Sequence, residues 1–196
     1  MTEYWPKTYL ALAMASGVFC AGPVHAEPAA FCGSGGARDW AQVRQALVGD
    51  WQVIHQSGFA RAGGMTMPFS ADDKVEIMTL SVNEDRLIGN HPGMQNPLIF
   101  HHAEEGRWNV DRGDPYKPDP VMTPDEVGVM YGCDQMEMPR LIGTSSAVIE
   151  GMKMNFTYRV LAVDRTTLYG VMEVTGTARG HEFLARRTVW LRAAGN

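Results

Sequence analysis

The residues of this sequence that could carry chemistry are mainly methionines, histidines and cysteines. Methionines recur three times with one residue between them, at Met65 and Met67, Met136 and Met138, and Met152 and Met154. Thioether sulfur is a soft ligand that selects Cu(I), so a periplasmic copper-binding protein is one hypothesis for this chain. Methionine also adapts to irregular apolar shapes, which suits a binding site for apolar molecules. Both interpretations stay open at this point.

Patterns that would indicate catalysis are incomplete. The range 101–105 gathers two histidines and two glutamates, but neighbours on a strand face opposite ways, so the two imidazoles are not expected to share an ion. The sequence has no nucleophile elbow, phosphate-binding loop or dinucleotide glycine motif. We therefore expect a protein that is not an enzyme, with no catalytic residue, metal site or cofactor. A hydrolase or isomerase that uses His55 or Tyr158 with a carboxylate stays an alternative.

The amino-terminal segment indicates export. Lys7 precedes an apolar run from Tyr9 to Cys20, and a small-residue cleavage site follows at Val24-His25-Ala26. This is the order of a secretory signal peptide, and the run is shorter than the about 20 apolar residues that cross a bilayer. We expect cleavage after Ala26 and a periplasmic or secreted mature protein. An uncleaved membrane anchor is the alternative.

Cleavage would leave two cysteines, Cys32 and Cys133, in a compartment where thiols oxidise. We predict a disulfide between them. It would close a loop of about 100 residues, which the chain-entropy model values at up to roughly 4.7 kcal/mol. The alternative is two unpaired thiols, one of them a metal ligand.

Length and composition predict one globular domain. The chain has 196 residues, of which 45% are hydrophobic and 20% charged, enough for a single core. The formal net charge of −5 argues against the broad basic surface that a phosphate backbone requires, so no nucleic-acid partner is expected. We divide the chain into a signal peptide (1–26), a flexible segment (27–36) and one domain (37–196).

The elements that must position these residues are one short helix and a series of strands. Trp40, Val43 and Leu47 recur at helical spacing in the range 37–48. The range 58–68 is predicted to be a glycine-rich loop, and the prolines of 112–126 predict another long loop. Strands are predicted at 51–57, 74–82, 86–89, 98–102, 108–110, 141–149, 152–163, 167–177 and 181–192. About eight or nine antiparallel strands favour a closed barrel, because closure removes exposed edges, and a two-sheet sandwich is the alternative.

Two residues suggest how the barrel closes. Trp51 opens the first strand in Gly49-Asp50-Trp51, and Arg187 lies on an otherwise apolar face of the last strand. If these strands pair, Trp51 offers Arg187 a cation-π contact, with Arg186 or Arg192 in its place if the register differs. On these residues the sequence resembles the lipocalin-like proteins of the calycin superfamily. The resemblance implies structural roles for Trp51 and Arg187, and an up-and-down barrel of eight strands with a cup for a small, often apolar, molecule.

The face that would line this cup can be read from the strand at 152–163. Met152, Met154, Phe156 and Tyr158 share one face of it, with Met172 expected beside them on the next strand and His55 on the first. An eight-stranded barrel either fills itself with side chains or holds one small ligand. We expect these six residues to bind an apolar or amphipathic molecule. The alternative is a filled barrel that binds a protein partner at the loop Pro115–Pro124.

Overall fold

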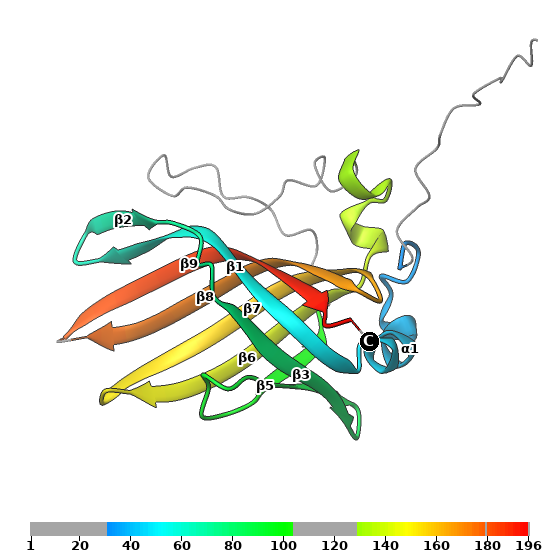
Figure 1. The fold of residues 1–196 in the computed structure, drawn as a ribbon, viewed down its shortest axis with the longest axis horizontal. Coiled ribbons are helices and arrows are strands. Elements are labelled where there is room, and N and C mark those ends of the chain that lie inside the picture. Colours follow the sequence, from blue (N-terminus) through cyan, green and yellow to red (C-terminus); the bar gives the residue numbers. More distant parts are fainter. Residues whose placement is uncertain (1–30, 104–128, 179, 196) are drawn as a thin grey trace, which may run out of the picture.

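The computed structural model describes residues 31–103, 129–178 and 180–195 of the chain (Figure 1). The expected signal peptide with its cleavage site after Ala26, the strand at 108–110 and the loop Pro115–Pro124 lie outside these residues. Among the described residues, no helix is long and apolar enough to cross a membrane.

The described chain begins with helical turns and continues as strands. A 3-10 turn η1 (Ala37–Asp39) leads into α1 (Trp40–Ala46), and a second 3-10 turn η2 (Gln135–Glu137) precedes the last four strands. The strands are β1 (Gly49–Ala62), β2 (Met65–Phe69), β3 (Val75–Asn83), β4 (Arg86–Asn90), β5 (Leu98–His102), β6 (Arg140–Ile149), β7 (Met152–Asp164), β8 (Thr167–Ala178) and β9 (His181–Ala193).

All strand pairs are antiparallel, and the sheet closes on itself. The order is β2-β1-β3-β4-β5-β6-β7-β8-β9, and β1 also pairs with β9. Eight strands, β1 and β3 to β9, therefore form a barrel, and β2 is an extra strand. The predicted antiparallel barrel of about eight strands with a short N-terminal helix is confirmed.

One edge of β1 pairs with β9, and the other edge changes partner along the strand. Residues 49–54 pair with β3, whereas residues 58–62 pair with β2. The strands β6 to β9 extend well past the short strands β3 to β5, toward the end of the molecule where β2 lies (Figure 1). We call this end the open end, and the end beside α1 the closed end.

The closed end is filled by apolar side chains. Val43 of α1 and Leu47, which caps the helix, are buried with Trp51 in one large core cluster, which also contains Phe100 and Tyr158. The indole Nε1 of Trp51 donates a hydrogen bond to the carbonyl oxygen of Leu47, 2.9 Å away. The helix therefore closes this end of the barrel.

The predicted loop at 58–68 is wrong. The strand β1 continues to Ala62, turns at Gly63-Gly64 and returns as β2. Both glycines have positive φ, 56° and 80°, as the tight turns that match the twist of a hairpin require. Two adjacent glycines between two segments that can pair are a sequence signal for a hairpin. The prediction instead assigned every glycine of the range to a loop.

The predicted disulfide between Cys32 and Cys133 is present, with the two Cα atoms 5.9 Å apart. Within the segment 27–36, which was expected to be flexible, Phe31 and Gly35 are buried. The Phe31 side chain is buried, and its amide donates a hydrogen bond of 3.2 Å to the carbonyl of Val163. The disulfide and this contact hold the start of the described chain against the barrel.

Candidate functional site

Along β7, the side chains on the inner face of the barrel change from buried to partly exposed. Tyr158 and Val160 are fully buried, whereas Met152, Met154 and Phe156 are partly exposed. These residues alternate with more exposed ones such as Lys153 and Asn155, so the predicted inner face of this strand is the observed one. The four strands β6 to β9 are long enough to continue beyond the packed core.

Strand register shows which inner residues lie beside one another at the point of change. Tyr158 pairs with Met172, Met172 with Arg187, and Arg187 with Gly58, which in turn pairs with Phe69. We call this set of five residues the floor row. It crosses the barrel from β7 to β2 and carries one charge, that of Arg187.

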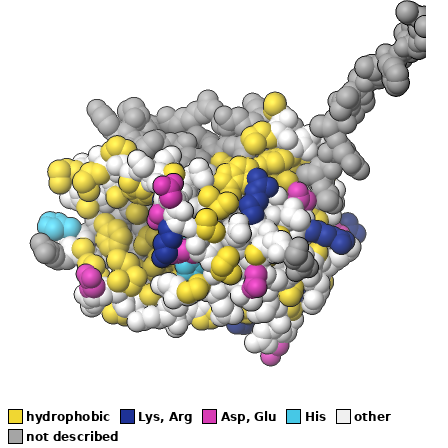
Figure 2. All heavy atoms as spheres, viewed as in Figure 1, with side chains coloured by type: hydrophobic (Ala, Val, Ile, Leu, Met, Phe, Trp, Pro, Cys, Tyr) yellow, Lys and Arg dark blue, Asp and Glu magenta, His cyan; other side chains and the backbone are white. Residues whose placement is uncertain are grey.

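Two further rows lie on the same face toward the open end, and neither carries a charged side chain. The first row contains Ser145, Phe156, Val174, Ala185, Ala60 and Met67. The second row contains Ala147, Met154, Gly176, Phe183, Ala62 and Met65. Several members are alanine or glycine, and their small side chains cover little of the inner face, although the Phe183 ring lies over Gly176. Hydrophobic side chains gather in this region in the space-filling view (Figure 2).

Arg187 is fixed at the floor row by two neighbours. Its Nε donates a hydrogen bond to the carbonyl oxygen of Gln56 at 3.0 Å, and its Cζ lies 5.1 Å from the centre of the Phe69 ring. Gly58 permits this approach, because a Cβ there would overlap the carbonyl oxygen of Arg186 and the side chain of Arg187. Burial lowers the pKa of Arg187 from its usual value.

The expected contact between Arg187 and Trp51 is wrong. The pairing of β1 with β9 is as predicted, but it places Trp51 opposite Ala193 and Arg187 opposite Gly58. A bulge in β1 between His55 and Gly58 adds to this separation. The ring under Arg187 is that of Phe69, which lies on a strand that was predicted to be loop.

The other two arginines of β9 also have partners away from Trp51. Arg186 forms an ion pair of 2.6 Å with Glu173 of β8. Arg192 stacks on Trp190, with its Cζ 4.7 Å from the ring centre. Among the described residues, Trp51 therefore has its contacts in the core and with α1 rather than with an arginine of the last strand.

A polar cluster lies on the closed-end side of the floor row and contains His55 of β1, Glu76 of β3 and His91, which follows β4. Oε2 of Glu76 is 3.5 Å from Nε2 of His55 and 2.9 Å from Nε2 of His91. Both histidines are buried, with exposed fractions of 7% and 9%. We call these three residues the His-Glu-His cluster.

The environment of the cluster sets the charge of two of its members. Burial and the nearby Arg187 lower the pKa of His55, so its imidazole is neutral at pH 7. Burial opposes ionisation of Glu76, but the hydrogen bonds from Lys74 and His55 and the charge of Lys74 outweigh it, and the pKa of Glu76 is lowered. The Nζ of Lys74 lies 2.7 Å from Oε1 of Glu76. Glu76 is therefore a carboxylate between basic groups.

Two predicted ligand contacts, His55 and Tyr158, lie at this boundary. Tyr158 is completely buried, its ring meets Phe100 edge-on at 6.4 Å, and burial raises the pKa of its hydroxyl. The other four, Met152, Met154, Phe156 and Met172, lie on the inner face and are partly exposed. The structure thus brings the predicted residues to one face of the barrel.

Sequence reasoning did not identify Glu76, and it did not place His91 beside His55. Glu76 shares a strand face with Met78 and Leu80, which are both buried, so a charged residue on an apolar face was a detectable signal. His91 lies in the loop after β4, where no periodic pattern indicates which way a side chain points. The structure was needed to place it beside Glu76.

The methionine pairs do not form one site. Met65 and Met67 are exposed on β2. Met138 is buried with Cys133 and Leu161, just after η2. In Figure 1, η2 lies in the yellow-green segment near α1, at the other end of the molecule from β2.

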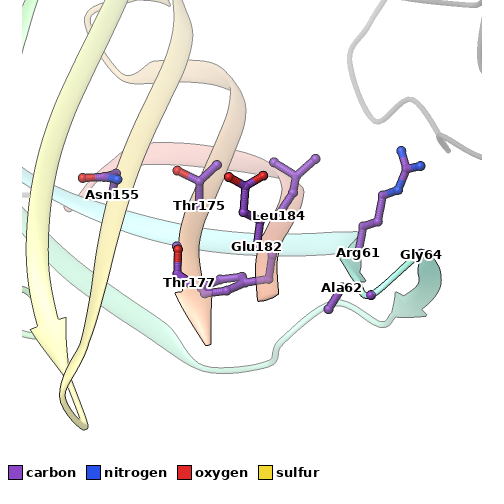
Figure 3. A pocket seen from close by; sticks show the side chains of 11 residues that line it. Arg61, Ala62, Gly64, Asn155, Thr175, Thr177, Glu182 and Leu184 are labelled. Carbon is purple, nitrogen blue, oxygen red and sulfur yellow. The ribbon is translucent and has the colours of Figure 1, made fainter. Parts of the chain in front are cut away.

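A shallow cavity of about 480 Å³ lies at the hairpin turns of the open end. Arg61, Asn155, Thr175 and Leu184 line it and form a row on the outer face of the barrel. Figure 3 shows Thr175, Leu184 and Glu182 projecting from neighbouring strands into it. The hollow is also lined by Ala62, Gly176 and Phe183, so it borders the second row at the open end.

Comparison of the chain with models of protein families and with curated protein sequences finds no match. The resemblance to lipocalin-like proteins accordingly stays a prediction, based on Gly49-Asp50-Trp51 and the order of the elements.

Proposed function

We propose that this protein binds a small amphipathic molecule, with the apolar part of the molecule against the two inner rows at the open end and an anionic group at Arg187. The observation that carries the proposal is the position of Arg187. It is the charged member of the floor row, and the uncharged rows begin beside it.

The inner rows favour an apolar occupant. Ala60, Ala62, Ala185 and Gly176 supply little side-chain volume, while Phe156 and Met154 supply apolar surface that is partly exposed. Contact that removes about 200 Å² of apolar surface from water contributes roughly 5 kcal/mol before the costs of association. Methionine in these rows adapts to occupants of different shape.

Arg187 favours an anionic group. Its Nε is used by the carbonyl of Gln56, and among the residues that the structure describes no carboxylate lies within ion-pair distance of its guanidinium. A half-buried guanidinium that stacks on Phe69 retains N–H groups for a carboxylate or similar anion. A fatty acid of medium chain length has the required chemistry.

Titration calorimetry with decanoate and decanol tests the anionic preference. We expect decanoate to bind more tightly than decanol, and Arg187→Gln to weaken decanoate by roughly 10- to 150-fold, the range that corresponds to a charged hydrogen bond of about 1.5–3 kcal/mol. Arg187→Lys should retain part of the preference. Equal affinity of the wild-type protein for decanoate and decanol would contradict the assignment of Arg187.

A volume substitution tests the position of the apolar part. Ala185→Leu fills inner space in the first row and should abolish decanoate binding. Thr177→Leu adds similar volume to an exposed residue of the outer face and serves as the matched control. Loss of affinity in both variants, or in neither, would contradict an inner site.

We also propose that the protein acts in the periplasm or outside the cell. The disulfide between Cys32 and Cys133 supports this location, since structural disulfides persist in oxidising compartments. Mass measurement of the exported protein would show whether the chain begins at Glu27.

A further inference from the structure

We propose that the His-Glu-His cluster binds a divalent transition-metal ion, for which Zn²⁺ has the best-matched ligand preference. The proposal is independent of the amphipathic ligand. One ligand atom each from His55, Glu76 and His91 lies within 4.8 Å of the other two. Three separate segments of the chain deliver them, β1, β3 and the residue after β4.

The unused hydrogen-bonding capacity of the cluster points to an occupant. Among the described residues, the buried Nε2 of His91, which faces Glu76, has no hydrogen bond of good geometry; Nδ1 of His55 also has none, but it lies on the ring edge away from Glu76. Nε2 of His91 is close to Glu76, but the direction of its N–H bond does not meet the carboxylate. Buried polar nitrogens are nearly always paired, so the exception at Nε2 of His91 requires an explanation.

The ligand types match zinc chemistry. Two neutral imidazoles and one carboxylate are a set that holds Zn²⁺ while leaving a fourth position open. The separations of 3.5 and 2.9 Å between the Glu76 oxygen and the two imidazole nitrogens place all three near a common point. Small side-chain movements would bring each atom to the about 2.0–2.2 Å that Zn²⁺ requires.

The surrounding charges limit the affinity. Lys74 contacts the other oxygen of Glu76, and Arg187 lies close enough to influence both Glu76 and His55. Lys74 is exposed and can turn into solvent when a cation occupies the site. Arg187 is held by Gln56 and Phe69, and its charge favours an anion, such as a carboxylate or chloride, as the fourth ligand.

Binding through His91 has a structural consequence at Gly93. Nδ1 of His91 accepts a hydrogen bond of 3.1 Å from the Gly93 amide, so the neutral ring carries its hydrogen on Nε2. Coordination by Nε2 requires the hydrogen to be on Nδ1 instead, and the bond from Gly93 must break. Gly93 is exposed, so water can replace that partner.

A second group of side chains of types that bind metals does not form a comparable metal site. Cys32, Cys133 and Glu137 also lie together, but the two sulfurs are joined in a disulfide. Neither sulfur is available as a thiolate, which is the form that binds metal.

The test uses the full chain without a histidine tag, stripped with a chelator and titrated with Zn²⁺ in competition with a chromophoric chelator. We expect one equivalent to bind to the wild-type protein. Glu76→Gln and His91→Asn should weaken binding by at least about tenfold, the loss caused by removing even a supporting partner of a metal ligand. His101→Ala, which removes an exposed histidine of β5, is the matched control.

Two further readouts separate a metal site from a folding defect. Circular dichroism and thermal melting should show that the variants are folded, and Zn²⁺ should shift the Gly93 amide resonance of the wild-type protein. Arg187→Gln and Ala185→Leu should still bind Zn²⁺, whether or not the proposed binding of an amphipathic molecule is correct. Absence of stoichiometric binding, or equal binding by wild type, Glu76→Gln and His91→Asn, would overturn the metal proposal.

Discussion

At the scale of single residues, Gly58 determines where Arg187 can lie. The β1 backbone approaches β9 at this point so closely that any Cβ would overlap Arg186 and Arg187. We predict that Gly58→Ala lowers the free energy of unfolding by about 1–3 kcal/mol, the usual cost of overpacking, as measured by urea denaturation. Gly195→Ala has open space around it and should leave the free energy unchanged. Equal effects of the two substitutions would show that the close approach is unimportant.

Tyr131 gives a prediction for alkaline pH. Burial raises its pKa to about 12, and its hydroxyl has no hydrogen-bond partner among the residues that the structure describes. Above pH 10 the unfolded chain releases this proton while the folded protein retains it, so stability falls as the pH rises from about 10 to about 12. Tyr131→Phe should remove part of that loss, which stability measurements at pH 8 and pH 11 would reveal. An unchanged difference between the two pH values would contradict this assignment.

The residues that could be predicted from sequence are those whose partners follow from a general rule. Cys32 and Cys133 were the two cysteines expected in an exported chain, so their pairing needed no geometry. The partner of Arg187 depended on register and on a bulge, which alternation of residue types does not determine. The His-Glu-His cluster depended on the fold bringing a loop residue to two strands.

At the scale of elements, alternating strands were predictable whether long or short, and the glycine-containing hairpin of β1 and β2 was not. The boundaries of β6 to β9 agree with the prediction to within one or two residues, because each strand is long and ends in a tight turn. The hairpin of β1 and β2 was missed, although it supplies Phe69 and two exposed methionines to the inner face. The missed element is therefore part of the candidate site.

The turn of this hairpin gives a prediction. Gly64 has φ of 80°, a conformation that β-branched residues rarely adopt and that asparagine tolerates. We expect Gly64→Val to speed hydrogen exchange of the β2 amides and to weaken decanoate binding, since Phe69 supports Arg187. Gly64→Asn should have a much smaller effect. Exchange that is equally slow in Gly64→Val and the wild type would show that the turn does not control this strand.

At the scale of the whole molecule, the barrel divides into a filled end that supplies stability and an open end that supplies surface. The disulfide lies near η2 and holds the start of the described chain to the filled end. Replacing both Cys32 and Cys133 by Ser should lower the free energy of unfolding by about 2–5 kcal/mol while leaving Zn²⁺ and decanoate affinities unchanged below the melting temperature. Chemical denaturation and calorimetry of the same samples would check both parts, and a parallel loss of affinity would link the disulfide to the binding sites.

The disulfide also affects how the protein withstands proteolysis. It encloses residues 33–132, which include β1 to β5, whereas β6 to β9 follow it in the chain. A single backbone cut within the enclosed range leaves the two fragments covalently joined, and they separate on a gel only after reduction. One cleavage in a protease-rich surrounding would therefore not release half of the barrel, and the nicked chain would keep all of its strands in one molecule.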